Sequence, residues 1–307
     1  MAGTTLREQG MSRILITGIN GQLGFELRRS LAMLGECICL DRQQLDLSRP
    51  ADIAAVLEQY QPDIIVNPAA YTAVDKAETD AELAHTVNAA APAAMADWAA
   101  AKNALLLHYS TDYVFDGDKT TPYEESDATN PQSVYGLSKY QGEQAILASG
   151  ANHIILRTSW VVGAHGGNFL KTIMRLARER DSLNVVADQI GAPTPAALIA
   201  DVTAHIIKQW QTSKDKQLLG TYHLTSSGST SWHGYSQYLL TLAERYGVAL
   251  QLKPENLHAI PGSAYPTPAK RPGNSRLNCS KIQDAFGLNM PTWQSGVEQV
   301  FQQIFNS

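Results

Sequence analysis

Short apolar runs alternate with longer amphipathic stretches along most of the chain. The runs are rich in apolar and β-branched residues, as is typical of strands buried in a parallel sheet. They lie at 13–17, 37–41, 64–67, 105–109, 154–157 and 221–224. Stretches with helical spacing of apolar residues, or with many alanines, lie at 22–34, 92–101 and 195–211. This alternation predicts an α/β protein whose parallel sheet is covered by helices on both faces.

A glycine-rich loop follows the first predicted strand. The segment 18–24 reads GINGQLG and stands directly before the first amphipathic stretch. In such a loop Gly18 permits the tight turn, Gly21 lets a pyrophosphate approach the backbone, and Gly24 lets helix and strand pack closely. The free amides at the helix start would face the phosphates. Strand, loop and helix together predict a dinucleotide site in a doubly wound parallel sheet of the Rossmann type.

The second predicted strand ends in an acid followed by a base. Asp41 lies about twenty residues beyond the glycines, where a carboxylate would accept hydrogen bonds from the ribose hydroxyls of NAD. Arg42 would instead suit the additional phosphate of NADP. The local charges do not choose between the two cofactors, so we expect either NADH or NADPH to serve.

A tyrosine and a lysine stand four residues apart, at Tyr135 and Lys139. On a helix this spacing brings both side chains to one face, one turn apart. The ordinary tyrosine pKa near 10 is too high for proton transfer at neutral pH, and a neighbouring ammonium would lower that pKa. Such a phenol can protonate a carbonyl oxygen while a reduced nicotinamide gives hydride to the carbon. The pair therefore predicts a carbonyl reductase.

The pattern of the chain changes towards the C-terminus. Six prolines, at 254, 261, 266, 268, 272 and 291, divide roughly the last 80 residues into expected loops and short helices. We therefore expect a smaller C-terminal α/β substrate domain, formed by 164–195 plus 226–307. The NAD(P)-binding Rossmann domain would comprise 11–163 plus 196–225. Residues 1–10 are polar, do not form a secretory signal and are expected to lie outside the fold.

Composition and charge argue against several other classes. The 307 residues are 44% hydrophobic and 17% charged, which is ordinary for a globular protein. A net charge of −5 and a pI near 5.9, without long runs of Lys or Arg, argue against nucleic-acid binding. No apolar stretch approaches the roughly 20 residues of a membrane span, and three cysteines give no paired framework. We expect a cytoplasmic protein without nucleic-acid or membrane partners.

Four longer segments carry a resemblance to a known family. They are 69–78 (AAYTAVDKAE), 108–115 (HYSTDYVF), 157–160 (RTSW) and 271–277 (RPGNSRL). With the glycine loop and the Tyr-x-x-x-Lys pair, they resemble the extended short-chain dehydrogenase/reductases and, within these, the dTDP-4-dehydrorhamnose reductases. The resemblance begins near Met11 and runs to the C-terminus. It implies NAD(P)H-dependent reduction of the C4 ketone of dTDP-4-dehydro-L-rhamnose to dTDP-L-rhamnose.

The resemblance also implies residue roles. Tyr135 would protonate the developing alkoxide, Lys139 would hold the nicotinamide ribose and lower the Tyr135 pKa, and Thr111 would bind the ketone oxygen or tune that tyrosine. Together with the glycine loop and the acid after the second strand, the expected cofactor contacts are Gly18, Gly21, Gln22, Leu23, Gly24, Asp41, Arg42, Asp46, Leu47, Ala70, Tyr71, Thr72, Tyr135 and Lys139. The expected substrate contacts are Thr111, Asp112, Trp160, Arg271 and Arg276, with the indole on a sugar face and the two arginines on the diphosphate.

Some members of the family are described as dimers joined through magnesium held by glutamates. Glu26 could supply one carboxylate, but the positions that align with the others carry Ala197 and Gln294. Magnesium requires near-complete coordination by oxygen. We therefore expect no tightly bound metal, and a monomer or a weak homodimer.

Two other functions stay open. The sequence pattern does not fix which face of the sugar meets the hydride, so a reductase of another dTDP-4-keto-sugar is one alternative. A non-catalytic regulatory subunit resembling that of methionine adenosyltransferase is the other. The presence of Thr111, Tyr135 and Lys139 favours an enzyme.

Overall fold

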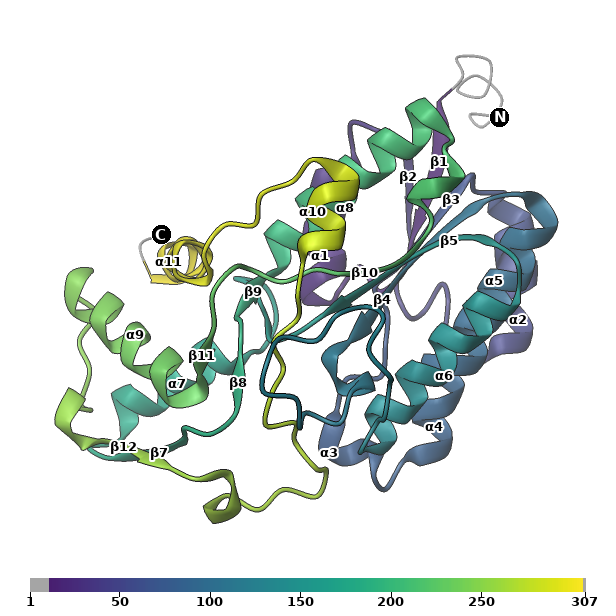
Figure 1. Ribbon diagram of the computed structural model, residues 1–307. Coiled ribbons are helices and arrows are strands. Elements are labelled where there is room, and N and C mark those ends of the chain that lie inside the picture. Colours follow the sequence, from purple (N-terminus) through teal and green to yellow (C-terminus); the bar gives the residue numbers. More distant parts are fainter. Residues whose placement is uncertain (1–10, 306–307) are drawn as a thin grey trace.

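The computed structural model describes residues 11–305 and has one six-stranded parallel sheet at its centre (Figure 1). The strand order is β10-β5-β4-β3-β1-β2, and every neighbouring pair is parallel. All six strands predicted from the apolar runs lie in this sheet. Their bounds are β1 Ser12–Ile16, β2 Gly35–Cys39, β3 Ile64–Asn67, β4 Leu105–Thr111, β5 Asn152–Thr158 and β10 Gly220–His223. The predicted α/β class with a doubly wound parallel sheet is confirmed.

Helices cover both faces of the sheet, because alternate strand residues point in opposite directions. Ile14 and Ile16 share a core with α1 and α8, whereas Leu15 between them packs with α2 and α5 on the other face. Figure 1 shows these two helical layers on opposite sides of the strands. The helices of this part are α1 Gln22–Leu31, α2 Pro50–Tyr60, α3 Val74–Ala77, α4 Ala81–His85, α5 Ala91–Lys102, α6 Val134–Ala148, α8 Ala196–Ser213 and α10 Ser280–Phe286.

Single turns of other helix types connect these elements. A π-helical turn, η2 Thr86–Ala90, joins α4 to α5. The alanine-rich helix α5 begins at Ala91, one residue before the predicted stretch 92–101. The 3-10 turns are η3 Asp112–Val114, η4 Lys216–Leu218, η5 Pro254–Asn256 and η6 Gly262–Ala264.

The first helix is shorter than the predicted 22–34. It ends at Leu31, and a short turn leads directly into β2, which begins at Gly35. Gly35 is therefore part of the strand and not the end signal of the helix. A Cβ at this position would lie 2.0 Å from the carbonyl oxygen of Ser12 in β1, so the close approach of the two strands requires a glycine.

A second hydrophobic core lies beside the sheet, in the lobe formed by α7 Phe169–Glu179, α9 Trp232–Arg245 and α11 Trp293–Phe305 (Figure 1). The three small sheets are β7 Leu183–Val186 with β12 Leu257–Ile260, β8 Ile190–Gly191 with β11 Thr230–Ser231, and β6 Val161–Val162 with β9 Thr194–Pro195. The six prolines fall between α9 and α11, as loop signals should. The expectation of short helices only was wrong, because α9 and α11 have 14 and 13 residues.

The predicted domain boundaries stay a prediction. One observation bears on them, since α10 packs against α8 and β10 through Ile282 and Phe286, on the core of the large sheet. Residues 1–10, expected to lie outside the fold, are outside the described residues. Within 11–305, no helix combines the length and the apolar composition that a membrane crossing would need.

The strand order creates a place for a ligand at one edge of the sheet. β1 has β2 on one side and β3 on the other, so the loops after β1 and β3 leave in different directions. Ligands of open α/β sheets bind beyond the carboxyl ends of the strands at such a switch point. The glycine loop follows β1 there, and Thr111 ends β4 at the same edge.

Candidate active site

The glycine loop has the conformation that its sequence predicts. Gly18 has a left-handed backbone with φ +55°, and a Cβ at Gly24 would lie 2.2 Å from the carbonyl oxygen of Gly18. α1 begins at Gln22, and no described side chain caps this start. Its first amides are therefore available to an anion. Leu23 is buried in the core below the loop, so its contact to a cofactor would be made by its backbone.

The loop after β2 carries the residues expected at the adenosine end. The Asp41 carboxylate accepts hydrogen bonds from two backbone amides of its own turn, at 2.8 and 3.1 Å. The Arg42 side chain is 78% exposed and forms a 3.5 Å ion pair with Asp46. Leu47 is buried in the core. A fixed carboxylate beside an exposed guanidinium leaves both cofactor types open.

The segment after β3 brings Ala70, Tyr71 and Thr72 to the same edge. It is held by Asn88, whose Oδ1 accepts from the Tyr71 amide at 2.8 Å and whose Nδ2 donates to the Tyr71 carbonyl at 3.0 Å. The same nitrogen donates to Ser138 Oγ of α6 at 3.0 Å. Asn88 is fully buried in the π-helical turn η2, a kind of turn that is frequent at functional sites. Asn88 was not predicted from the sequence, because it lies before the predicted helix 92–101; its only local signal is a polar residue beside the three alanines at 89–91.

Tyr135 and Lys139 lie one turn apart on α6, as their spacing predicts. Ser133 caps the start of α6, because its hydroxyl accepts a hydrogen bond from the Gly136 amide at 3.1 Å. Tyr135 therefore lies in the first turn, close to the end of β4. Its ring meets that of Tyr113 edge to face, with centroids 5.4 Å apart.

Thr111 and Asp112 lie beside this tyrosine. The Thr111 hydroxyl donates to Asp112 Oδ1 at 3.0 Å, and it also lies within hydrogen-bonding reach of the Tyr135 phenol. Asp112 is only 3% exposed. Burial raises the pKa of its carboxyl group to about 6, although hydrogen bonds from Ser275 and Thr111 act in the opposite direction. A carboxyl group whose ionisation is costly therefore lies next to Tyr135, the predicted proton donor.

The two predicted catalytic groups are shifted by burial and not by each other. Burial raises the Tyr135 pKa, which Thr111 lowers and Asp112 raises further. Burial lowers the pKa of Lys139 to about 8. The expectation that Lys139 lowers the Tyr135 pKa is not met, because the lysine nitrogen turns to β4. There it donates to the Tyr109 carbonyl at 2.6 Å and lies 3.1 Å from His108 Nε2.

A cavity of about 470 Å³ opens between the sheet edge and the second core. Tyr113 lines it and connects it to Tyr135. The other walls come from α7, β7 and the 265–275 segment. Its lining combines aromatic and aliphatic side chains with a few polar groups, which is the usual composition of a small-molecule site.

Trp160 is held in this cavity by a strained backbone. Its φ is +48°, and the other described non-glycine residues with positive φ, which are Gln61, Asn103 and Lys214, all end helices. The indole stacks on Trp232 with centroids 3.5 Å apart and planes 11° apart. Strain of this kind is found where a side chain must be aimed at a ligand. Trp232 could not be predicted from the sequence, because its contact with Trp160 joins the start of α9 to the end of β5, and these elements lie far apart along the chain.

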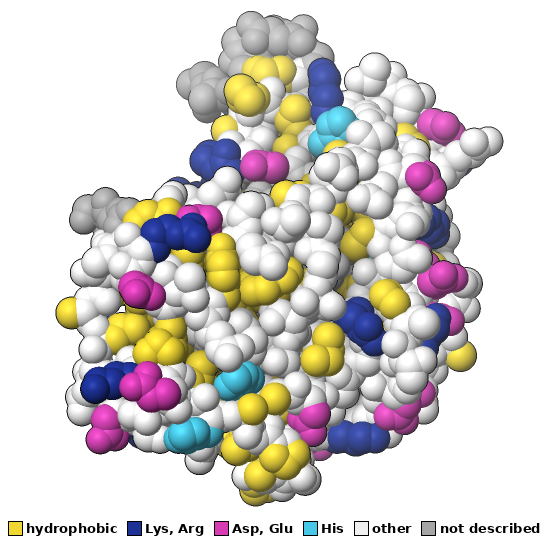
Figure 2. All heavy atoms as spheres, turned by 60° about the vertical axis from the view of Figure 1, so that its left-hand side comes forward, with side chains coloured by type: hydrophobic (Ala, Val, Ile, Leu, Met, Phe, Trp, Pro, Cys, Tyr) yellow, Lys and Arg dark blue, Asp and Glu magenta, His cyan; other side chains and the backbone are white. Residues whose placement is uncertain are grey.

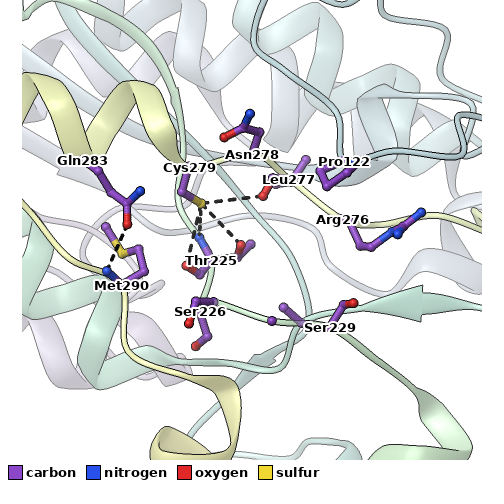
Figure 3. Close-up of a pocket in the computed structure, with 13 residues that line it drawn as sticks. Pro122, Thr225, Ser226, Ser229, Arg276, Leu277, Asn278, Cys279, Gln283 and Met290 are labelled. Carbon is purple, nitrogen blue, oxygen red and sulfur yellow. Dashed lines mark hydrogen bonds between the residues drawn. The ribbon is translucent and has the colours of Figure 1, made fainter.

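The two arginines expected to form one fork lie in different places. Arg271 lines the 470 Å³ cavity and donates to Asp75 at 2.5 Å and to the Tyr113 hydroxyl at 3.2 Å. Arg276 lines a separate cavity of about 440 Å³ together with Cys279. Its guanidinium donates to the Thr120 carbonyl at 2.7 Å, and Figure 3 shows it directed away from Cys279. Arg276 therefore does not share a ligand site with Arg271.

Buried polar atoms gather at the carboxyl edge of the sheet. Ser110 Oγ and Asp112 Oδ2 at the end of β4, and Thr158 Oγ1 and Ser159 Oγ at the end of β5, accept or donate no hydrogen bond within the described residues. Unpaired buried polar atoms are costly and are uncommon outside functional sites. Their position favours a polar ligand at this edge.

No group of three or more His, Cys, Asp or Glu side chains that could hold a metal occurs in the described residues. Glu26 forms a 3.6 Å ion pair with Arg29. The expectation of no tightly bound metal stays a prediction. Charged side chains of both signs are dispersed over the face shown in Figure 2, without a continuous basic patch there. The absence of a nucleic-acid partner likewise stays a prediction.

The fold and this site define a class of protein, the extended short-chain dehydrogenase/reductases. A glycine loop after β1 and a Tyr-x-x-x-Lys pair on α6 meet at one edge of a parallel sheet, next to a cavity for a second ligand. The family model described as RmlD substrate binding domain matches residues 11–306. The chain belongs to this family, that of the dTDP-4-dehydrorhamnose reductases.

Individual relatives agree with this assignment. The dTDP-4-dehydrorhamnose reductase of Salmonella typhimurium is 46% identical over 298 residues, covering 96% of this chain and 98% of the relative. The crystal structure of the enzyme of that name from Bacillus anthracis, in complex with NADP, is 34% identical, with a TM-score of 0.85 and coverage of 95% and 99%. A probable dTDP-4,6-dihydroxy-2-methyloxan-3-one 4-ketoreductase of Streptomyces antibioticus is 36% identical, with coverage of 95% of each chain.

Proposed function

We propose that this protein reduces the C4 ketone of dTDP-4-dehydro-L-rhamnose to dTDP-L-rhamnose with NADPH or NADH. The observation that carries the proposal is the grouping of Thr111, Tyr135 and Lys139 at the carboxyl edge of the sheet, beside a cavity of suitable size and lining. The likeness to reductases of this name over nearly the whole chain supports the same substrate.

The three loops at the sheet edge would hold the dinucleotide. The uncapped start of α1 would bind the pyrophosphate through Gly21, Gln22 and Leu23, and Asp41 with Arg42 would meet the adenosine end. The NADP in the Bacillus anthracis structure supports this choice of cofactor. When bound, the reduced nicotinamide supplies the hydride.

The side chains of this protein would supply the proton and the orientation. The Tyr135 phenol is protonated at neutral pH and can give its proton to the ketone oxygen as hydride reaches the carbon. Burial raises its pKa and makes it a weaker acid, so the transfer depends on the negative charge that develops on that oxygen. Thr111 would turn its single hydroxyl hydrogen from Asp112 to that oxygen and so donate a second hydrogen bond to it. A positioned acid contributes about 10²- to 10⁴-fold to the rate.

The 470 Å³ cavity would hold the sugar nucleotide. The stacked indoles of Trp160 and Trp232 offer a flat apolar surface to one face of the ring, and Arg271 offers a cation to the diphosphate. Asp112 would orient the sugar hydroxyls. Arg276, which lines the other cavity, is not part of this proposal.

Domain division and assembly belong to the same proposal. We retain 11–163 plus 196–225 as the cofactor domain and 164–195 plus 226–307 as the substrate domain, with α10 of the second range packed on the core of the first. We also retain a monomer or weak homodimer in the cytoplasm. The two separate cores support two domains.

The test is turnover with enzymatically prepared dTDP-4-dehydro-L-rhamnose. Loss of NADPH and NADH absorbance is followed, and the sugar product is identified by NMR. Formation of dTDP-L-rhamnose is expected. The C4 epimer, or turnover only with other dTDP-4-keto-sugars, would favour the alternative reductase to which the Streptomyces antibioticus relative points. Cofactor binding without turnover of any keto-sugar would favour a regulatory subunit.

A further inference from the structure

A row of buried polar side chains crosses the sheet from the glycine loop to Lys139. Thr17 follows β1, Asn67 ends β3 and His108 lies opposite Asn67 in β4. Thr17 is 1% exposed, Asn67 and His108 are 0% exposed, and Lys139 is 2% exposed. Thr17 Oγ1 lies 2.6 Å from Asn67 Oδ1, Asn67 Nδ2 lies 3.1 Å from His108 Nδ1, and His108 Nε2 lies 3.1 Å from the Lys139 nitrogen. The mechanism proposed above uses only the last of these residues.

The direction of the hydrogen bonds in this row is set at its first member. The Thr17 hydroxyl donates to Asn67 Oδ1, so the amide nitrogen of Asn67 faces the ring and donates to His108 Nδ1. Burial and, after it, the charge that Lys139 carries when protonated lower the His108 pKa well below its ordinary value, so the imidazole is neutral. A neutral ring that accepts at Nδ1 carries its hydrogen on Nε2. His108 therefore presents an N–H, and not a lone pair, to Lys139.

The His108 N–H and a lysine ammonium are both donors only, so they cannot form a hydrogen bond with each other. A neutral lysine amine has a lone pair and can accept a hydrogen bond from this N–H. The arrangement is complete when Lys139 is an amine that accepts from His108 and donates to the Tyr109 carbonyl at 2.6 Å. A bound ribose would require the opposite, because its hydroxyl oxygens accept hydrogen bonds best from an ammonium.

We propose that His108 positions Lys139 and restrains its charge, so that cofactor binding draws a proton from water onto this lysine. The proposal rests on the proposed function in one respect, that the cofactor reaches Lys139. One N–H bond forms on the lysine nitrogen as one O–H or N–H bond of a water molecule or buffer acid breaks, and the conjugate base of that donor stays in solution. Thr17 adjoins Gly18, so the row also connects the lysine to the first turn of the glycine loop.

Other charged groups around Lys139 do not override the effect of burial and of His108 on its charge. Glu143 lies one turn further along α6 and raises the Lys139 pKa. Glu143 is itself paired with Arg157 of β5, at 2.6 and 2.9 Å, so most of its charge is balanced. The turn η2 contributes the neutral Asn88. Burial prevails, and the pKa of Lys139 falls to about 8.

The test is the number of protons taken up when NADPH binds at pH 8.5, measured by calorimetric titration in two buffers of different ionisation enthalpy. At this pH the phosphates of the cofactor are already fully ionised, since their last pKa is near 6. The wild-type protein should take up roughly three quarters of a proton, the fraction of a group with a pKa near 8 that is unprotonated at this pH. Lys139→Met should bind with an uptake near zero.

A second variant reverses the direction of the hydrogen bond between residue 67 and His108. In Asn67→Asp the carboxylate accepts from His108 Nδ1–H, which turns the Nε2 lone pair towards Lys139 and favours the ammonium before cofactor binds. Its uptake at pH 8.5 should fall by at least half. His153→Gln, in the neighbouring strand β5 and bonded only to the Ala151 carbonyl among described partners, is the matched control and should behave as wild type. Thermal melting checks that each variant folds.

Three results would overturn the proposal. They are cofactor binding to the wild-type protein without uptake, the same uptake in Lys139→Met, and the same uptake in folded Asn67→Asp. None of them depends on turnover, so a protein that reduces the keto-sugar but takes up no proton would refute this inference and leave the proposed function intact. Proton uptake without any keto-sugar reduction would do the reverse.

Discussion

The catalytic wall of the site (Thr111, Tyr135 and Lys139) and its recognition wall (Trp160, Trp232 and Arg271) are supported in different ways. Each catalytic residue lies on, or at the end of, a regular element of the large sheet layer. Trp160 and Arg271 lie in loops that are fixed by contacts with distant segments. We infer that chemistry is placed by the sheet and that recognition is placed by packing between the two cores. Changes to the first wall should lower kcat, and changes to the second should raise KM.

The largest effect that would sharpen this comparison is expected for Tyr135→Phe. Removal of the phenol oxygen leaves the ring in place but removes the proton donor, so kcat should fall at least ~100-fold while the Kd of NADPH changes less than about threefold. Steady-state kinetics and fluorescence titration measure the two quantities. Tyr113→Phe is the control, because its ring packs on Tyr135 while its hydroxyl serves Arg271. Unchanged kcat in Tyr135→Phe would remove the catalytic wall from the mechanism.

The sequence predicted the catalytic wall better than the recognition wall, and the reason is physical. Tyr135 and Lys139 are joined by helical spacing, and Thr111 by its place at a strand end, so local rules are enough. The Trp160–Trp232 stack depends on the packing of the second core, which no local pattern encodes. The partners of Lys139 also escaped prediction, since they depend on the register of β4 below α6.

The arginine pair could not be separated by a local rule. The segment between Arg271 and Arg276 bends at Gly273 and is not a regular strand, so strand alternation does not place the two side chains. Contacts with distant residues separate them, with Arg271 on Asp75 and Arg276 on the Thr120 carbonyl. The six strands, by contrast, followed directly from the apolar runs, because a sheet buried on both faces requires continuous apolar sequence.

Asp112 lies between the two walls, next to Thr111 and Ser275. Ionisation of its buried carboxyl group should lower the stability of the folded protein. Its folded pKa of about 6 lies above the ordinary 3.8, so the folded protein binds more protons than the unfolded chain between these values. Stability from this group is therefore complete below pH 4 and is lost as pH rises through 6. Asp112→Asn should raise the free energy of unfolding at pH 7 by about 3 kcal/mol relative to wild type, given ~1.4 kcal/mol per pKa unit.

Urea unfolding from pH 4 to pH 7 measures this difference. The gain of Asp112→Asn over wild type should be small at pH 4, should grow to pH 6 and should then stay constant. Asp118→Asn, at an exposed position in the same loop region, should show no such trend. A gain that is equal at pH 4 and pH 7 would mean that the carboxylate of Asp112 is not the destabilising group.

A smaller effect, confined to substrate binding, is expected for Arg271→Lys. A lysine cannot bond to Asp75 and Tyr113 together and still face a diphosphate, so KM for the sugar nucleotide should rise about tenfold with little change in kcat. Arg276→Lys is the matched control and should change KM less than about twofold, because that guanidinium serves the Thr120 carbonyl. Equal effects of the two substitutions would break the separation of the arginines.

The smallest predicted effect concerns neither wall but the choice of cofactor. Arg42 is 78% exposed and its ion pair with Asp46 is long, at 3.5 Å, so its guanidinium is free to meet a 2′-phosphate at little cost. Arg42→Ala should raise KM for NADPH about three- to tenfold and leave KM for NADH within about twofold. Arg49→Ala, which removes an arginine of similar exposure that is paired with Asp52 at 3.6 Å, is the control. If KM for both cofactors changes equally in Arg42→Ala, the arginine acts on the loop and not on the phosphate, and selectivity must then come from Asp41.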